Sequence, residues 1–251
     1  MILETPTTDQ LLGLDDTHVE QIDATAALGA VRLHPATARD FLVLRAAAAA
    51  DGIDLRIVSG HRGFQRQLAI WNAKARGERV LLDAEERVLD ALELSPDARV
   101  LAILRWSALP GTSRHHWGSD LDVVDAAALA PGSAPSLLAV DYAPGGSQER
   151  LARWLERRLD ADPASLFFRP YDGVGDGVSG EPWHLSHAPL AALCQAAFDL
   201  ERLKDVLAAS GLELWETVDS ALGDLLPRFA RVDATRYPPA WRDRLPALGR
   251  A

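Results

Sequence analysis

SRHHWGSDLD, residues 113–122, is the stretch that decides how this chain folds. It brings two adjacent histidines, a tryptophan and two aspartates together, directly after a Pro-Gly pair that is typical of a turn. Because that pair and Gly118 disfavour a continuous helix, we expect a loop that turns at Gly118. The apolar run LDVVD (121–125) then predicts a short buried strand. Such a loop followed by a strand can bring the side chains of His115 and Asp122 to one point.

The carboxylate of Asp122 needs a strong partner if it lies inside this apolar strand, because burying a carboxylate alone is costly. A metal ion is one such partner. Further along the chain, EPWHLSH (181–187) supplies Glu181 and His184, three residues apart. Two neutral imidazoles and one carboxylate are the ligand set of a catalytic zinc, which keeps its fourth position for water. A second carboxylate near that water is the general base that such a site needs.

A third motif, SGHRGFQRQ (59–67), lies upstream, where a predicted strand ends. With it, the pattern S-x-H-x-x-G-x-x-x-D followed by E-x-W-H resembles the signature of the lysostaphin, D-alanyl-D-alanine carboxypeptidase and hedgehog group of zinc peptidases. The VanY-type carboxypeptidases are the members that the chain resembles most. The three motifs occur in the family's order and frame residues 55–190, which we expect to form the zinc peptidase core.

The resemblance implies a metal site and a catalytic base. His115, Asp122 and His184 match the family's zinc ligands, so one Zn²⁺ per chain is expected. Glu181 matches the general base, which takes a proton from the zinc-bound water and later returns it to the leaving amine. Arg62 is implied as a further catalytic group, because a guanidinium suits either the terminal carboxylate of a peptide or the developing oxyanion.

The substrate contacts implied by the resemblance are Arg62, Gln67, Ser113 and Trp183. The implied reaction is hydrolysis of the terminal peptide bond to a D-amino acid, D-alanine, in small peptidoglycan-derived or precursor peptides. Two alternatives stay open: a peptidoglycan endopeptidase of the same fold, and a non-catalytic, zinc-stabilised binding module. Glu181 counts against the module, since a structural zinc needs no base. D,D- and L,D-specificity, the oligomeric state and the metal actually bound stay open as well.

Residues beside the motif positions have other expected roles. His116 falls on a variable position, so we expect it beside the site or on the surface. Asp120 lies on the same side of the strand as Asp122, where it either crowds the metal or hydrogen-bonds a ligand histidine. We expect His187 to be a hydrogen-bonding structural residue rather than a fourth ligand. Arg114 is expected to be a solvated surface charge, with extension of a cationic rim as the alternative.

The composition indicates a globular protein and excludes several classes of partner. Of the 251 residues, 48% are hydrophobic and 25% charged, and the net charge is -10. This acidic balance argues against nucleic acid and against attachment to an anionic membrane surface. No apolar run is long enough for a membrane span, and the first residues lack the basic region of a signal peptide. We therefore expect a cytoplasmic protein, or a periplasmic one if a leader is missing. The single cysteine, Cys194, is expected to be a small buried hydrophobe.

The fold class predicted is α+β, in one domain over residues 1–251. A small, mostly antiparallel sheet is expected to carry the zinc site and to be flanked by helices. Residues 1–54 are expected to form a helical lead-in and residues 190–251 a helical extension with an irregular proline-rich end. The patterns predict helices at 36–50, 63–77, 83–94, 95–104 and 147–160, strands at 55–60 and 121–125, and a hairpin over 165–187.

Overall fold

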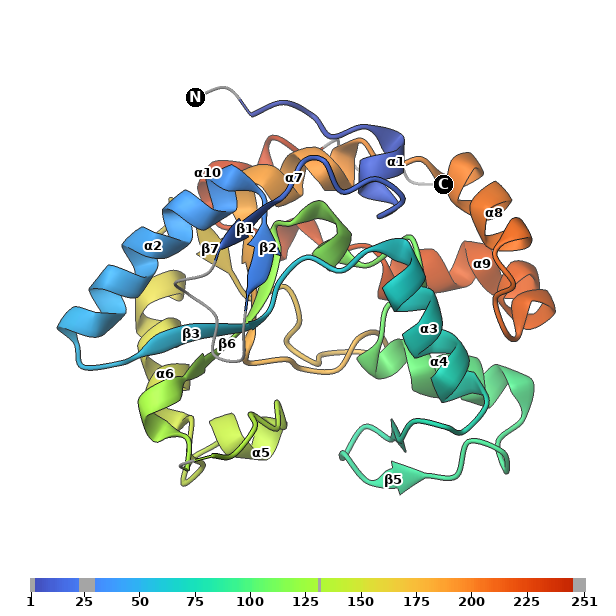
Figure 1. Cartoon of the computed structure of the whole chain (residues 1–251), viewed down its shortest axis with the longest axis horizontal. Helices are drawn as coiled ribbons and strands as arrows, with labels where there is room; N and C mark the ends of the chain where they lie inside the picture. Colours follow the sequence, from blue (N-terminus) through green and yellow to red (C-terminus); the bar gives the residue numbers. More distant parts are fainter. Residues whose placement is uncertain (1–2, 23–29, 131, 246–251) are drawn as a thin grey trace.

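A four-stranded antiparallel sheet in the order β3-β6-β8-β7 forms the centre of the protein. The structure, a computed structural model, describes residues 3–22, 30–130 and 132–245 (Figure 1). The strands are β3 (Leu55–Ser59), β6 (Asp120–Asp125), β8 (His184–His187) and β7 (Phe167–Phe168). The predicted α+β class with a small antiparallel sheet is confirmed, as are the strand before the SGHR motif and the hairpin of β7 with β8.

The pairing register of this sheet brings the three sequence motifs together. Asp122 on β6 is the Cα partner of Ser59 on β3 and also of His184 on β8. The register of β3 shifts between Ile57 and Ser59, which is the mark of a bulge at the end of the strand. Segments more than sixty residues apart in the chain therefore meet at one end of β6.

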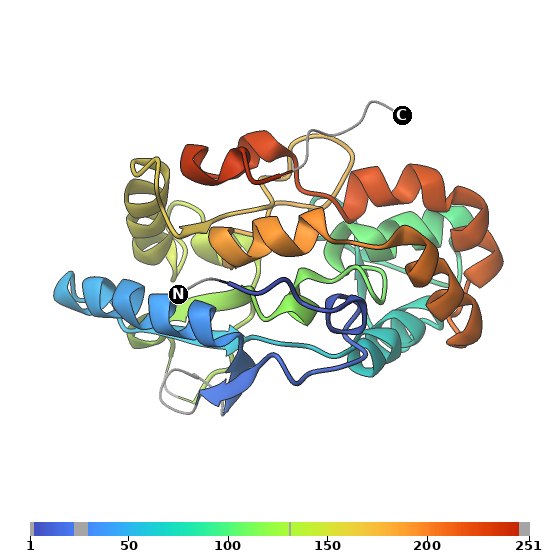
Figure 2. The same cartoon turned by 90° about the horizontal axis from the view of Figure 1, so that it is seen from above.

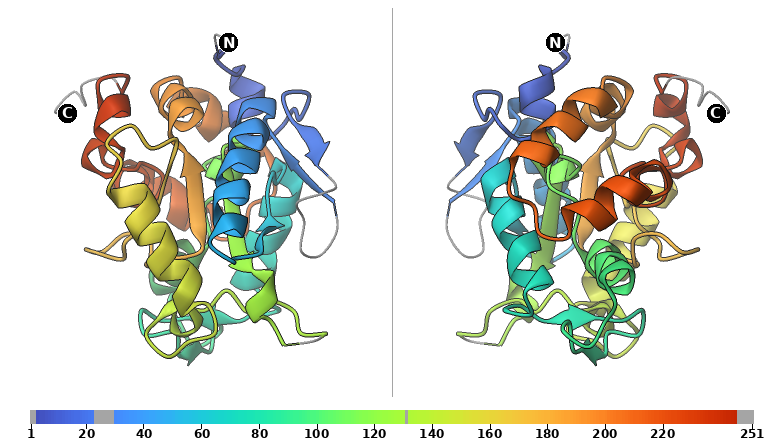
Figure 3. Two further views of the ribbon diagram at one scale, coloured as in Figure 1. Left: turned by 90° about the vertical axis from the view of Figure 1, so that its left-hand side faces the viewer. Right: turned by 90° about the vertical axis from the view of Figure 1, so that its right-hand side faces the viewer.

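Side-chain alternation along β6 gives the sheet one apolar and one polar face. Leu121 and Val123 point to the apolar face, whereas Asp120 and Asp122 share the other. The apolar face packs against α2 (Pro35–Ala50) and α6 (Glu149–Leu155), which face the viewer in the left panel of Figure 3. The polar face, with Asp120 and Asp122, carries the candidate functional site.

A second group of helices packs into a separate core beside the end of the sheet where the three motifs meet. It contains Trp71, whose indole nitrogen donates to the carbonyl oxygen of Glu213 at 2.9 Å. This contact ties the C-terminal extension to the SGHR motif region. The helices of this group are α3 (Phe64–Ala75), α4 (Pro96–Trp106), α8 (Leu200–Ala209) and α9 (Trp215–Phe229), seen together in the right panel of Figure 3.

The predicted helix over 83–94 is wrong, because a small hairpin stands in its place. Its strands β4 (Leu81–Leu82) and β5 (Val88–Leu89) pair antiparallel. Asp83 does cap backbone N–H groups, of Glu85 and Arg87, but within a tight turn. Glu86 has a positive φ of 59° and accepts a hydrogen bond from the distant backbone N–H of Ala139 instead of closing a capping box. The capping signal therefore marked a turn between two short strands.

The chain ends contain elements that the sequence did not predict in detail. The lead-in holds α1 (Thr8–Leu11) and a hairpin of β1 (Glu20–Ile22) and β2 (Val31–Leu33) besides α2. The proline-rich end forms α10 (Pro239–Arg242), and its last six residues lie outside the described part of the chain. The remaining helices are α5 (Ala139–Tyr142) and α7 (Ala188–Ala196), the latter seen along its length in Figure 2. No helix among the described residues has the length and apolarity needed to cross a membrane.

Candidate metal centre

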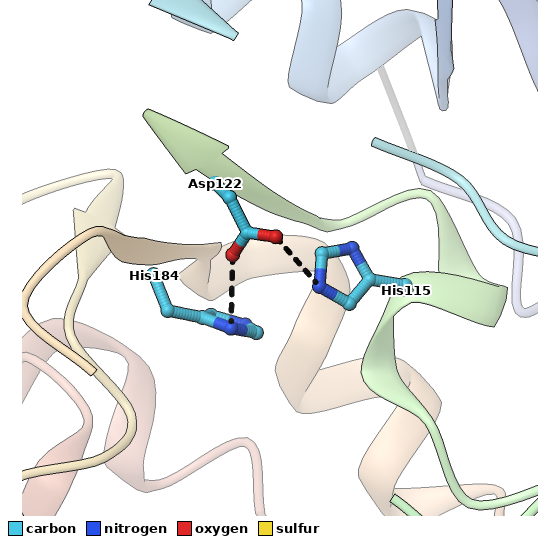
Figure 4. A group of neighbouring side chains, drawn as sticks. All are labelled: His115, Asp122 and His184. Atoms are coloured by element: carbon cyan, nitrogen blue, oxygen red, sulfur yellow. Dashed lines mark ion pairs between the residues drawn. The ribbon is translucent and has the colours of Figure 1, made fainter. Parts of the chain in front are cut away.

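Three side chains of types that can ligate a metal converge on the polar face of the sheet (Figure 4). His115 comes from the 3-10 turn η2 (Arg114–Trp117), Asp122 from β6 and His184 from β8. The Nε2 atom of His115 lies 3.6 Å from Oδ2 of Asp122, and Nδ1 of His184 lies 3.4 Å from Oδ1. All three side chains are buried. The structure thus brings together the three residues that the resemblance assigns to zinc.

The spacing of these donor atoms fits a tetrahedral ion. Zinc bonds of roughly 2.0–2.2 Å at the tetrahedral angle place neighbouring donors about 3.4 Å apart. The two histidine–Asp122 distances, 3.6 Å to Oδ2 and 3.4 Å to Oδ1, are close to that value. Burial raises the pKa of Asp122 to about 6, and the nearby Glu181 carboxylate adds to this effect. A bound cation would compensate such a buried carboxylate.

The second ring nitrogen of each histidine is hydrogen-bonded, which orients the first toward Asp122. Nδ1 of His115 lies 2.9 Å from the carbonyl oxygen of Gly60, so it carries the proton. Nε2 of His184 lies 2.8 Å from Oδ2 of Asp120. Burial holds the pKa of His115 well below its ordinary value, which favours the neutral imidazole that a metal requires.

Gly118 sets the position of His115 by ending η2 in the left-handed region, with φ at 66°. A Cβ atom there would come within 2.7 Å of the backbone nitrogen of His34 and 2.5 Å of the Val19 side chain. The chain can therefore turn from η2 into β6 at this point only with glycine. The loop predicted from the sequence is thus a single 3-10 turn closed by glycine.

Asp120 is the centre of a buried polar network behind His184. Its carboxylate accepts hydrogen bonds from Arg114 Nε at 2.9 Å, Ser119 Oγ at 2.5 Å and Ser186 Oγ at 2.8 Å. Burial alone would raise the pKa of Asp120, but Arg114 and His184 bring it below its ordinary range. Of the two expectations for Asp120, the hydrogen bond to a histidine is the one that the structure shows.

The expectation that Arg114 is a solvated surface charge is wrong. Arg114 is 2% exposed and forms a buried ion pair with Asp120. Its guanidinium also donates to Ser186 Oγ at 2.6 Å and lies over the ring of Trp117, 4.8 Å from the centroid. Asp120, whose charge compensates the buried Arg114, lies six residues further along the chain, after the turn at Gly118.

Glu181 stands directly beside the ligand cluster. Its Oε2 atom lies 3.0 Å from Nδ1 of His184, the nitrogen that faces Asp122. The turn that precedes β8 holds it there, with the backbone N–H of His184 bonded to the carbonyl oxygen of Glu181 at 3.0 Å. A carboxylate in this position can exchange protons with a molecule bound between the donors.

The cluster opens into a cavity of about 700 Å³. Ser113 and Trp183, both predicted to contact substrate, line it, and so does Arg62. Gln67 is fully buried behind Arg62, accepting a hydrogen bond from its Nη1 at 2.9 Å. Tyr171 adds an aromatic wall, with its ring 5.0 Å from that of His184.

His116 and His187, two further histidines close to the cluster in sequence, have structural roles. His116 is fully buried, and its ring bonds the backbone carbonyl of Arg62 and the N–H of Gly111. His187 lies 3.0 Å from a carboxylate oxygen of Asp40, as expected of a structural residue. Cys194 is buried, as predicted.

Residues 30–190 match the sequence model of the VanY family, D-alanyl-D-alanine carboxypeptidases. The chain belongs to the VanY family. The match covers well over half of the sequence and spans every residue of the metal cluster and of the SGHR motif. The membership predicted from three short motifs is therefore confirmed.

Other known proteins resemble this VanY family member over part of its length. An uncharacterized Haemophilus influenzae protein is 35% identical over 103 residues, which are 41% of this chain and 70% of that protein. A mutant of the vancomycin resistance D,D-pentapeptidase VanY, solved with Zn(II), is 24% identical with a TM-score of 0.47, covering 74% of this chain and 89% of that one. The LdcB LD-carboxypeptidase is 17% identical with a TM-score of 0.48, covering 76% and 78%.

Two cavity-lining cations, Lys74 and Arg79, were not singled out from the sequence. A charge count along the chain could have found them. The protein has 36 acidic and 26 basic residues, yet residues 62–79 reverse this balance. That segment contains one acidic residue, Glu78, and the basic residues Arg62, Arg66, Lys74, Arg76 and Arg79.

Proposed function

We propose that this VanY family protein is a zinc-dependent carboxypeptidase. It would hydrolyse the terminal peptide bond to a D-amino acid, D-alanine, in peptidoglycan-derived or precursor peptides. The observation that carries the proposal is the placement of Glu181 beside a buried His115–Asp122–His184 cluster at a cavity. Family membership supports the peptidase class, and the donor distances support zinc as its cofactor.

The proposed reaction divides the work between the metal and the chain's own residues. When bound by His115, Asp122 and His184, Zn²⁺ supplies Lewis acidity at the reacting carbonyl and at water. Glu181 accepts the proton of the attacking water and delivers it to the leaving amine, as a general base and then a general acid. Arg62 receives the oxyanion or the terminal carboxylate of the peptide, and its hydrogen bond to buried Gln67 fixes its direction.

The size of the cavity also supports the alternative function, a peptidoglycan endopeptidase. A volume of about 700 Å³ lies within the range of sites that enclose a whole small ligand, so the site has room beyond a terminal residue. A binding module without turnover is less well supported, because Glu181 has no role in holding a structural zinc.

Peptide hydrolysis with product mass spectrometry tests the proposal. The protein is incubated with muropeptides and with D-Ala-D-Ala-ended peptides, with zinc and with a chelator. We expect zinc-dependent release of D-alanine, and its loss in Glu181→Gln with zinc still bound. Glu85→Gln, which changes an exposed carboxylate of the β4–β5 turn, is the matched control. Internal cleavage products would instead support the endopeptidase, and the absence of any zinc-dependent product would refute both peptidase forms.

A further inference from the structure

One wall of the cavity carries positive charge away from the metal ligands. Ile70 and Lys74 are four residues apart on α3, and both side chains line the cavity, as expected for one helix face. Arg79 lines it from the segment that follows the helix. Arg62 enters from the other end, before α3 begins. Only Lys74 of the three lies on α3 itself, in its last turn, and Arg62 precedes the far end of this 12-residue helix, which is about 18 Å long at a rise of about 1.5 Å per residue.

The three cations lack carboxylate partners within the described part of the chain. Lys74 Nζ donates one hydrogen bond, to Ser107 Oγ at 2.7 Å, which leaves two of its three protons free. Arg62 donates to Gln67 and to Ser59, both neutral. Arg79 forms no ion pair among the described residues.

Among the described residues, no acidic residue of the cavity wall forms an ion pair with Lys74 or Arg79. Glu78 forms an ion pair with Arg76 at 2.8 Å, and Glu86 accepts the backbone N–H of Ala139 at 2.8 Å. Asp122 is a member of the His115–Asp122–His184 cluster, and Glu181 stands directly beside it. The positive charge of Lys74 and Arg79 is therefore directed at the cavity itself, in a protein whose net charge is -10.

The surroundings of Lys74 make its charge costly in the free protein. Burial lowers the pKa of Lys74 to about 8, and the positive charges of Arg79 and Arg62 lower it further than Glu181 raises it. A cation that is partly desolvated and unpaired gains free energy when an anion enters beside it. A cation such as Lys74 in this condition, inside a cavity next to a reaction centre, is typical of a ligand site. Arg79 is exposed and adds its charge from the rim of the same cavity.

We propose that Lys74 and Arg79 form an anion subsite that binds a second carboxylate of the substrate peptide. This inference rests on the proposed function and specifies its substrate class: peptides that carry an acidic group in addition to the one received by Arg62. Arg62 serves the reacting end, because Asp122 and Glu181 are the carboxylates that act on its charge. Lys74 offers a point charge and Arg79 a planar fork, and together they suit a carboxylate.

The test compares two peptides that differ only in one group, a glutamate side chain or its glutamine amide. The acidic residue is placed in turn at each of the three positions before the scissile bond. When the acidic residue stands at the position that reaches the subsite, we expect KM for the acidic peptide to be about tenfold lower than for the amide peptide. Such a difference is consistent with a charge-assisted hydrogen bond. In Lys74→Gln and Arg79→Gln this preference disappears, because only the acidic peptide is weakened.

Two controls make the result specific. Lys74→Arg keeps the charge and should keep most of the preference. Arg66→Gln removes an exposed cation of the same helix that does not line the cavity, and should leave both peptides unaffected. Equal changes in KM for the acidic and the amide peptide, or no preference in the unaltered protein at any register, would overturn the subsite.

Failure of the proposed function would be visible separately. If the unaltered protein releases no amino acid from any peptide, the carboxypeptidase proposal fails. The subsite is then tested independently, by calorimetric binding of the same two peptides. Preferential binding of the acidic peptide, lost in Lys74→Gln, supports the subsite without turnover. Equal binding of both peptides refutes it.

Discussion

Nε2 of His184 lies 2.8 Å from Oδ2 of Asp120, so one aspartate of β6 orients the histidine whose other nitrogen faces Asp122. The two aspartates alternate with Leu121 and therefore share one face of the strand. A single strand thus supplies both one member of the candidate metal site, Asp122, and the carboxylate that hydrogen-bonds a second member, His184 of β8. Hydrogen-bond partners of this kind set the tautomer and direction of a ligating imidazole.

Replacing Asp120 by asparagine should weaken zinc binding about 10- to 100-fold, the range typical for loss of such a partner. The amide keeps the volume of the side chain but removes the charge that supports His184. Competition titration with a chelating dye measures the zinc Kd. Asp205→Asn, an exposed change on α8, is the control. An unchanged Kd in Asp120→Asn would show that the hydrogen bond does not tune the site.

Removing the charge of Arg114 should destabilise the fold strongly. Arg114→Met leaves Asp120 as a buried carboxylate without its cation, a change that costs about 3–5 kcal/mol in other buried pairs. Arg87→Met breaks a comparable Arg–Asp contact of 2.7 Å on the surface and should cost far less, since exposed ion pairs contribute little. Urea denaturation compares the free energies of unfolding. Similar losses in the two variants would contradict the structural role given to the buried pair.

The anion subsite should lose affinity as the pH rises through about 8. Lys74 is charged below that value and becomes neutral above it, so KM for an acidic peptide rises while KM for its amide analogue does not. The same lowered pKa means that the unfolded chain binds more protons between about pH 8 and pH 10.5, so this group adds stability as the pH rises there. The other Arg, Asp and Glu side chains that line the cavity with Lys74 are Arg62, Glu78, Arg79, Glu86, Arg114, Asp122 and Glu181.

The matched variant for this pH dependence is Lys74→Arg, which stays charged throughout the range because an arginine pKa exceeds 12. Its preference for the acidic peptide should persist at pH 9. A parallel loss of preference in the arginine variant and the unaltered protein would assign the titration to another group.

Substituting Gly118 by alanine should displace η2 and, with it, His115. The new Cβ would meet the backbone of His34, and the residue would have to keep a φ of 66°. Gly145 also has a positive φ, but a Cβ there meets nothing within 4 Å, so Gly145→Ala isolates the conformational cost alone. We expect both variants to lose stability and only Gly118→Ala to lose zinc affinity as well. Equal zinc affinity in the two variants would show that Gly118 does not position the metal site.

The strands and motifs of the site could be predicted because their signals are local. LDVVD reads as a buried strand, and the ligand types at positions 115, 122 and 184 carry their own chemistry. The burial of Arg114 could not be predicted in this way, because it depends on the turn at Gly118 that folds Asp120 back onto it. Asp83 begins a turn rather than a helix because Glu86 bonds a distant segment. Lys74 gains its setting only when α4 and the loop before β8 close the cavity around α3.

Metal analysis of the purified protein and of His184→Ala tests the central claim most directly, namely that three side chains from η2, β6 and β8 bind one divalent cation. We predict one zinc per chain in the unaltered protein, loss of that zinc in His184→Ala, and its retention in His18→Ala, a half-buried histidine outside the cluster. Full zinc occupancy in folded His184→Ala would contradict the account.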